Sequence, residues 1–304
     1  MASNFITRAY NKISKDKDTI LKESTNDKLD NEINFFKNIP SSLKKYFPEY
    51  ISSQKKDNIY YLKLQYIESK DLGYFITEQK DIDWVYIIKH LVGAVEHFKE
   101  TTIETNLILE DKTSMLIDKT YNEFKNFSSR DHSQHLTKPT TINSNGIELR
   151  NFEQIWPDIK LKIEELKTTN HSFIHGDLCF ANILLSDNKD IYFVDPRGSY
   201  GSTKYCYGDY RYDYAKLLHS IDGSYEFIIR DKFNLNDLDY QIQNYKNKSD
   251  LLKEFKSSIS EDDYKAALLI QGLIFIGMCD RHYDSHERQT VMYLTGLKIL
   301  NELL

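Results

Sequence analysis

The stretch from Phe173 to Gly201, FIHGDLCFANILLSDNKDIYFVDPRGSYG, places polar side chains that could do chemistry between strongly apolar neighbours. These polar residues are His175, Asp177, Asn182 and Asp195. Burying a charge that has no partner is energetically expensive, so packing alone gives no reason for this pattern. The segment therefore indicates a site where two carboxylates, an amide and an imidazole are used chemically.

Phosphoryl transfer is a reaction that needs such groups. A carboxylate orients the attacking hydroxyl or takes its proton, and oxygen ligands hold Mg²⁺ on the nucleotide phosphates. Asp177 and Asn182 are five residues apart, the interval found in the kinase catalytic loop H-R-D-x-x-x-x-N. Asp195 follows at the end of the strand-like run IYFVD, where the kinase pattern has its second metal ligand. The three groups thus occur in the order that this chemistry requires.

The segments HGDLCFANIL, DPRGSYG and YGDYRYDYAKLLHSIDGSY carry a family resemblance. They are similar to the aminoglycoside phosphotransferase and choline kinase superfamily, whose fold resembles that of protein kinases. Within it they most resemble bacterial small-molecule kinases that are often encoded among capsule or surface-polysaccharide genes. The specific match lies within residues 175–225, and looser similarity extends over most of the chain.

The resemblance implies a role for each polar residue of the motif. Asp177 would be the catalytic base or the residue that orients the hydroxyl, and Asn182 and Asp195 would be Mg²⁺ ligands. His175 would support the loop, and Asp213 would hold that loop from behind through backbone N–H groups. A simpler reading of Asp213 is that it complements the dipole at the start of a helix.

A small-lobe lysine that neutralises the α and β phosphates, held by a helix glutamate, is also implied. We assign Lys22 in TILKES and Glu32 in DNEINFF to these roles, with Lys12 as the competing lysine. Glu32 borders the apolar stripe of a predicted helix, where a carboxylate needs a cationic partner. The chain has no G-x-G-x-x-G motif, so a glycine-free loop must cover the phosphates.

The nucleotide base in kinase-like folds binds to the backbone of the segment between the lobes. The run LKLQYIES would supply that hinge, which places Tyr66 and Ile67 at the base of ATP or GTP. The alternative for these residues is a buried edge strand. Sequence does not distinguish ATP from GTP here.

Arg197 stands out because the chain contains 32 lysines and only eight arginines. It follows Asp195 by two residues, so we expect it near the transferred phosphoryl group or near an anionic acceptor. For Arg211 and Arg288 we favour solvated charges.

The segment GMCDRHYDSHERQ follows a very apolar helical run. Because acceptors in this superfamily often meet the later helices of the large lobe, His282 and Asp284 are candidate acceptor contacts. The alternative is an exposed connection between two helices.

The elements that must position these groups form two lobes. Residues 1–67 contain no glycine and include strand-like runs at 5–14, 18–24 and 58–67, with a helical pattern at 26–39. From about residue 81 helical patterns dominate, including an apolar stripe at Val85, Ile88, Leu91, Val92 and Val95. Residues 126–146 read as a loop or hairpin. We therefore predict an α+β, bilobal, protein-kinase-like fold, with a nucleotide-binding lobe at 1–69 and a catalytic, acceptor-binding lobe at 70–304.

Composition restricts the class of protein. The net charge of −6 argues against a nucleic-acid partner, and 40% hydrophobic residues suffice for a packed core. Three cysteines without a CxxC spacing suggest neither a disulfide framework nor a structural metal site. The start of the chain lacks the apolar core of a leader, and the most apolar run, 267–278, is too short to span a bilayer. We expect a cytoplasmic protein without membrane insertion, and its oligomeric state stays open.

The sequence thus predicts a Mg²⁺-dependent phosphotransferase that moves the γ-phosphate of ATP or GTP to a hydroxyl of a small polar molecule. A sugar or polysaccharide precursor is the leading acceptor. Choline or another amino alcohol and an aminoglycoside are the alternatives within this class. A catalytically silent kinase-like binding module is the alternative outside it, and the intact Asp177, Asn182 and Asp195 argue against that reading.

Overall fold

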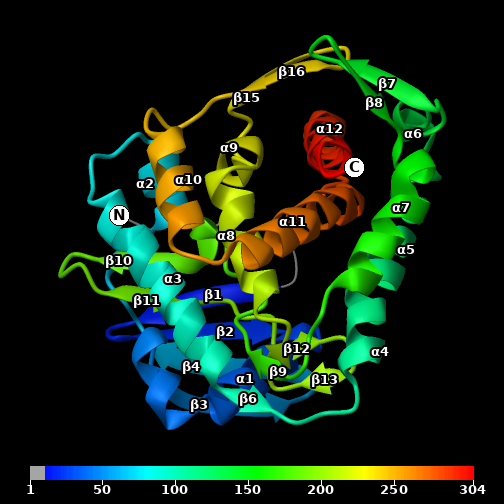
Figure 1. Cartoon of the computed structure of the whole chain (residues 1–304). Helices are drawn as coiled ribbons and strands as arrows, with labels where there is room; N and C mark the ends of the chain where they lie inside the picture. Colours follow the sequence, from blue (N-terminus) through cyan, green and yellow to red (C-terminus); the bar gives the residue numbers. More distant parts are fainter. Residues whose placement is uncertain (1–10) are drawn as a thin grey trace.

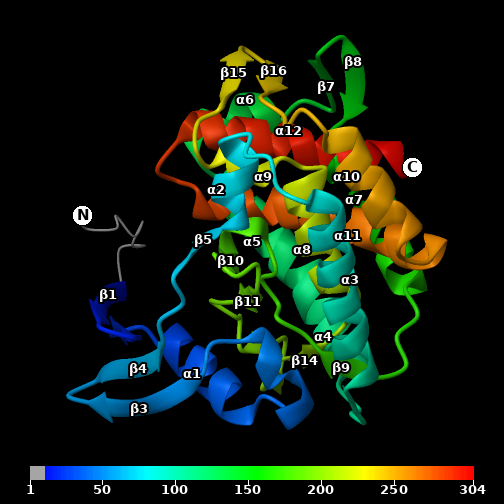
Figure 2. The same ribbon diagram turned by 90° about the vertical axis from the view of Figure 1, so that its left-hand side faces the viewer.

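A computed structural model describes residues 11–304. It contains a small unit built on one antiparallel sheet and a larger, mainly helical unit, seen below and above in Figure 2. The α+β architecture predicted from the sequence is confirmed.

The small unit is a four-stranded sheet in the order β1-β2-β4-β3, with one helix packed on it. Its elements are β1 (Asn11–Asp16), β2 (Thr19–Ser24), α1 (Lys28–Asn38), a 3-10 turn at Ser41–Tyr46, β3 (Tyr50–Lys56) and β4 (Ile59–Gln65). The first predicted strand, 5–14, lies partly outside the described residues. The sequence pattern missed β3, because this edge strand, YISSQKK, faces largely outward and has few apolar residues.

Short strands connect the two units and frame the motif region. After β4 the chain runs into β5 (Ser69–Asp71), which pairs antiparallel with β10 (Ile183–Ser186), and β10 pairs with β11 (Ile191–Phe193). A second small sheet joins β6 (Thr102–Ile103), β9 (His171–Phe173) and β14 (Tyr207–Gly208). The motif therefore lies between two small sheets, with a further pair formed by β12 (Ser199–Tyr200) and β13 (Thr203–Lys204).

Helices make up most of the large unit (Figure 1). They are α2 (Leu72–Thr77), α3 (Trp84–Glu100), α4 (Ile108–Lys112), a π-helical segment at Thr113–Asp118, α5 (Lys119–Ser128), α6 (Gln134–Thr137), α7 (Phe152–Glu165), α8 (Arg211–Ile221), α9 (Tyr225–Ile228), α10 (Lys248–Ser257), α11 (Glu261–Arg281) and α12 (His286–Glu302). Two hairpins complete the unit: β7 (Thr141–Ser144) with β8 (Ile147–Arg150), and β15 (Phe233–Asn236) with β16 (Asp239–Ile242).

Local sequence explains two of these elements. Asn145 and Gly146 have positive φ angles and turn the β7–β8 hairpin, as expected for an Asn-Gly pair. In α3 the predicted apolar stripe is buried except at Val85, which is 46% exposed. That part of the prediction was wrong. In the first turn of α3 the side chain that is buried is Trp84, and the adjacent Val85 points towards solvent.

An aromatic cluster joins the two units below the motif. Phe35 and Phe47 from the small unit contact Phe173 and the ring of His175, at centroid distances between 5.3 and 6.4 Å. Phe193, at the end of β11, packs against the same cluster. Since these rings are fully buried, the strands that precede the motif aspartates are fixed against the small unit.

The helical core lies around α8 and α11, which pack against each other, while α11 also packs against α5 and α12 (Figure 1). The most apolar run of the sequence, 267–278, lies in the buried part of α11. Within residues 11–304, no helix combines the length and the apolar character needed to cross a membrane.

Candidate active site

The HGD segment forms a tight turn directly after β9. Gly176 has φ +77°, a conformation that L side chains rarely adopt, and a Cβ there would lie 2.8 Å from the Cβ of Arg197. The N–H of Arg197 donates to the carbonyl of His175, 2.9 Å away. The glycine thus allows the loop that carries Asp195 to lie directly on the loop that carries Asp177.

Asp213 holds this turn from behind. It accepts hydrogen bonds from the N–H groups of His175 (2.7 Å) and Gly176 (2.8 Å). The Asp213 side chain is fully buried, and burial raises its pKa to about 7 although both N–H groups act in the opposite direction. The carboxylate therefore fixes the backbone of the loop.

His175 ties the two motif loops together through both ring nitrogens. Nε2 lies 3.0 Å from the carbonyl of Val194, and the N–H of Asp177 donates to Nδ1 at 3.2 Å. A carbonyl needs a donor and an N–H needs an acceptor, so this geometry requires the neutral imidazole with its proton on Nε2. Burial also favours the neutral imidazole, because it lowers the pKa of His175 to about 4.

Asp177 is held from two sides. The amide nitrogen of Asn182 donates to its backbone carbonyl (2.8 Å) and to its Oδ2 (3.2 Å), and the ammonium of Lys216 lies 2.9 Å from its Oδ1. Sequence reasoning missed Lys216. The available signal was a lysine in the otherwise apolar run YAKLLHSI, and its side chain is indeed only 7% exposed. Burial would lower the pKa of Lys216, but Asp177 outweighs burial and raises it, so Lys216 stays charged.

Lys22 bridges the two units. Its ammonium lies 2.6 Å from Glu32 Oε1 and forms an ion pair with Asp195. Burial would lower the pKa of Lys22, but the two carboxylates outweigh burial and raise it. Burial raises the pKa of Glu32 to about 7 against the effect of Lys22, since two carboxylates share one ammonium. Lys12, the competing lysine, is 76% exposed and lies 3.9 Å from Glu23.

Asp195 and Asn182 offer the oxygen atoms that a hard divalent cation prefers. Asp195 has φ +57°, and its side chain is 54% exposed. Partial desolvation of the carboxyl opposes its ionisation, but contact with Lys22 lowers the pKa of Asp195, so it is a carboxylate. The amide nitrogen of Asn182 is used by Asp177, which leaves its oxygen as the atom for a ligand. This donor set fits Mg²⁺.

Tyr66 and Ile67 lie between β4 and β5, at the junction of the two units. The N–H of Tyr66 already donates to the carbonyl of Asp18 at 2.8 Å, and the Lys15 ammonium lies 3.5 Å from the centre of its ring. The N–H of Ile67 makes no hydrogen bond within residues 11–304. Of the two residues, Ile67 is therefore the one whose backbone can donate to a base.

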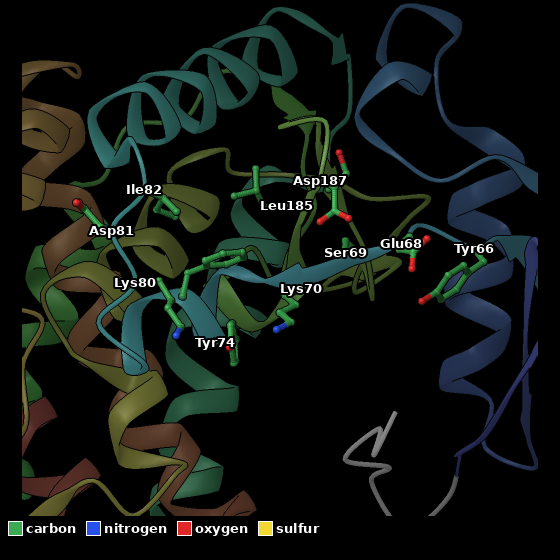
Figure 3. Close-up of a pocket in the computed structure, with 12 residues that line it drawn as sticks. Tyr66, Glu68, Ser69, Lys70, Tyr74, Lys80, Asp81, Ile82, Leu185 and Asp187 are labelled. Carbon is green, nitrogen blue, oxygen red and sulfur yellow. The ribbon is translucent and has the colours of Figure 1, made fainter. Parts of the chain in front are cut away.

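A cavity of about 540 Å³ borders this connector (Figure 3). Tyr66 lies at one end, and Lys70, Tyr74 and Leu185 line its middle. Asp177, Asn182 and Asp195 are not among its lining residues. The cavity is thus lined by the connector and by the end of β10, and the motif aspartates do not line it.

One arginine differs from the sequence-based expectation. Arg211 is only 8% exposed and binds Asp209 through Nε (2.8 Å) and Nη2, so the prediction of a solvated charge was wrong. Asp209, two residues earlier, is close enough for its carboxylate to offset the cost of burying the guanidinium. Arg288 binds Asp231 and Asp284 at 2.7 and 2.8 Å. Arg197 has its backbone beside Gly176, at the motif turn.

The two C-terminal candidates lie differently with respect to the motif. The ring of His282, at the end of α11, is 6.3 Å from the ring of Tyr225, and Lys216 lies over that same tyrosine. His282 is therefore linked through Tyr225 to the partner of Asp177. Asp284 is 60% exposed and pairs with Arg288, and no contact between it and the motif exists among the described residues.

The comparisons with known proteins concern the fold. No family model matches the chain, and no curated protein matches it. Among solved structures, the apo form of a thermostable mutant of aminoglycoside phosphotransferase APH(4)-Ia is similar with a TM-score of 0.52 at 11% identity. Aminoglycoside phosphotransferase APH(4)-Ia itself gives 0.50 at 10% identity. Both similarities cover 96% of this chain and 94% of the other. The chain therefore has the kinase-like fold of the aminoglycoside phosphotransferases.

Proposed function

We propose that the protein is a nucleotide-dependent phosphotransferase that moves a γ-phosphoryl group to a hydroxyl of a small polar acceptor. The observation that carries the proposal is the convergence of Lys22 from the small unit with Asp195 and the Asp177–Asn182 pair from the large unit. These are the groups that phosphoryl transfer needs, and they meet where the two units join. The fold shared with aminoglycoside phosphotransferases supports the same reading.

Each group has one task in this proposal. Lys22, held by Glu32, binds the nucleotide phosphates, and the Ile67 N–H binds the base. Asn182 and Asp195 hold Mg²⁺, which when bound neutralises charge on the β and γ phosphates. Residues 1–69 would form the nucleotide-binding unit and 70–304 the catalytic unit. The small sheet ends at Gln65, and β5, which begins at Ser69, pairs with β10 of the large unit, which supports a change of unit between residues 65 and 69.

The reaction centre is Asp177. It accepts the proton of the acceptor hydroxyl while that oxygen bonds to the γ-phosphorus, and the bond from γ-phosphorus to the β,γ-bridging oxygen breaks. Lys216, Asn182 and the His175 ring hold the Asp177 loop, so the carboxylate is oriented before the acceptor binds.

For the acceptor we propose a sugar or polysaccharide precursor, on the resemblance of the motif to capsule-associated kinases. The cytoplasm would be the working compartment, and three buried free cysteines are compatible with it.

The direct test is a panel of sugars, sugar phosphates, amino alcohols and aminoglycosides, assayed for nucleotide consumption and for phosphorylated product with Mg²⁺ and ATP or GTP. Asp177→Asn serves as the control for background hydrolysis. Acceptor-dependent consumption that this substitution abolishes supports the proposal. A protein that binds neither nucleotide in the presence of Mg²⁺ contradicts it.

A further inference from the structure

Helix α11 packs against both α5 and α8 (Figure 1). A group of basic side chains acts at this place, beside the motif. Lys119 begins α5, Arg281 ends α11, and Arg197 lies two residues beyond Asp195. Tyr212, in the first turn of α8, lies among them. The reaction proposed above does not use Lys119, Arg281 or Tyr212.

One carboxylate fixes two of these cations. Glu123 binds the Lys119 ammonium at 3.1 Å through Oε2 and the Arg281 Nε at 3.0 Å through Oε1. Glu123 itself lies directly against the backbone of α11, because a Cβ on Gly277 would collide with its Oε2. The glycine leaves room for the Glu123 carboxylate here. Lys119 and Arg281 are therefore held in place by packing as well as by charge.

Arg197 adds a third cation without a matching anion. Its backbone is fixed by the carbonyl of His175 and by the close approach of Gly176. Across residues 11–304, its guanidinium forms neither a hydrogen bond nor an ion pair. Glu123 thus pairs with two of the three cations, Lys119 and Arg281, and Arg197 adds a positive charge that no ion pair balances among the described residues. A guanidinium fixed at its backbone and unpaired at its tip is suited to bind an anion.

The electrostatics of Tyr212 show that these charges act at one place. The residue is 5% exposed, and burial alone would raise its pKa. Lys119, Arg197, Lys216 and Arg281 outweigh burial and lower it. The charge of Asp177 also acts on Arg281, so the cluster is within electrostatic range of the reaction centre. The negative charges that face the cluster, Glu123 and Asp177, are each already held by a lysine.

We propose that Arg197, Lys119 and Arg281 bind an anionic group of the acceptor, so that the substrate is a hydroxyl compound bearing a carboxylate or a phosphate. This inference rests on the proposed function, because it places the acceptor hydroxyl at Asp177. An acidic or phosphorylated sugar meets both requirements. Cationic acceptors such as amino alcohols and aminoglycosides would meet like charge at this position and bind poorly.

The test compares four acceptors that share one scaffold: a neutral hexose, the corresponding uronic acid, the hexose phosphate and the amino sugar. Each is assayed with saturating Mg²⁺ and nucleotide against the wild type, Arg197→Gln and Arg281→Gln. Arg150→Gln is the matched control, since Arg150 is half exposed, lies outside the cluster and pairs only with Asp158 among the described residues. The uronic acid and the hexose phosphate arms distinguish the two sources of negative charge.

We expect the wild type to prefer one of the two anionic acceptors over the neutral hexose by at least about a hundredfold in kcat/KM, because two charge-assisted contacts are gained. Arg197→Gln should raise the KM of that acceptor by at least about tenfold and leave the KM of the neutral hexose within about twofold. Arg281→Gln should act in the same direction, while Arg150→Gln should match the wild type.

A binding measurement keeps the inference testable without turnover. The four acceptors are titrated by calorimetry into protein saturated with Mg²⁺ and a non-hydrolysable nucleotide. If neither anionic compound binds more tightly than the neutral hexose, or if Arg197→Gln and Arg281→Gln both keep wild-type affinity, the anionic acceptor is excluded while the phosphotransferase proposal stands. Failure of the nucleotide itself to bind would instead reject the proposed function.

Discussion

The ammonium of Lys216 lies 2.9 Å from Oδ1 of Asp177, at the centre of the candidate site. Lys216 follows Asp213 by three residues on α8, so both side chains project from the same face of that helix. Asp213 holds the backbone of the loop and Lys216 holds its carboxylate. A single buried helix therefore sets the position of the loop and the direction of Asp177.

Replacing Lys216 tests this positioning role. Lys216→Met keeps a long apolar stem in a buried place and removes the partner of Asp177, so we expect kcat to fall at least about tenfold with little change in the nucleotide KM. Steady-state kinetics at fixed Mg²⁺ measure both constants. Lys265→Met, at an exposed residue paired with Glu261, is the control and should match the wild type. Equal losses in kcat and in nucleotide affinity would point to a general structural defect instead.

Asp177→Asn removes the proton acceptor and keeps the size of the side chain. We expect turnover to drop by about a hundredfold or more, the range of general-base catalysis, while the nucleotide still binds. Stopped assays for product and a nucleotide titration measure the two effects on one preparation. Turnover close to that of the wild type would show that Asp177 does not act on the hydroxyl.

Asp195 leads to a prediction about metal and nucleotide together. Lys22 and Asp195 are paired in this structure, so nucleotide phosphates that bind Lys22 and a cation that binds Asp195 should bind cooperatively. We expect Mg²⁺ to tighten nucleotide binding to the wild type at least about tenfold. In Asp195→Ala this Mg²⁺ dependence should largely disappear, while binding without metal is kept or improved because Lys22 then has Glu32 as its one carboxylate partner among the described residues. Calorimetry with and without Mg²⁺ measures the effect, and an unchanged Mg²⁺ dependence in the variant would exclude Asp195 as a ligand.

Much of the fold could be predicted from the sequence, because the spacing of apolar residues indicates which side chains are buried. The apolar run in α11 and the Asn-Gly turn of the β7–β8 hairpin are local signals, and the structure has both. Edge strand β3 gave no such signal, since an edge strand with one exposed face needs few apolar residues. At Val85 the pattern predicted burial where the side chain is exposed, because an apolar residue in the first turn of a helix need not face the core.

The site divides in a similar way. The pairing of Lys22 with Glu32 could be predicted from a carboxylate that borders a buried stripe and needs a cation. Partners from distant segments could not, as with Lys216 on Asp177 and the two cations on Glu123. Arg211 was misread because its exposure depends on the segment around Thr168, which its Nη2 contacts. Such contacts arise from tertiary packing, and sequence spacing does not encode them.

The last prediction concerns acid stability and His175. Its pKa is about 4 in the folded protein because of burial, against about 6.5 in an unfolded chain. At a pH between these two pKa values, His175 is protonated in the unfolded chain and neutral in the folded protein. The free energy of unfolding should therefore fall as the pH drops from 6.5 towards 4, by roughly 3 kcal/mol from this residue alone, and should not change through it above pH 7.

Urea denaturation of the wild type and His175→Gln between pH 7 and pH 4.5 measures this component. The variant loses stability at pH 7, because the Val194 carbonyl and the Asp177 N–H lose well-placed partners. Its further loss towards pH 4.5 should be smaller than that of the wild type, so the two curves converge on acidification. His135→Gln, at an exposed histidine, should run parallel to the wild type. Parallel curves for His175→Gln as well would show that the imidazole already takes up its proton in the folded state, which the Nδ1 acceptor geometry does not allow.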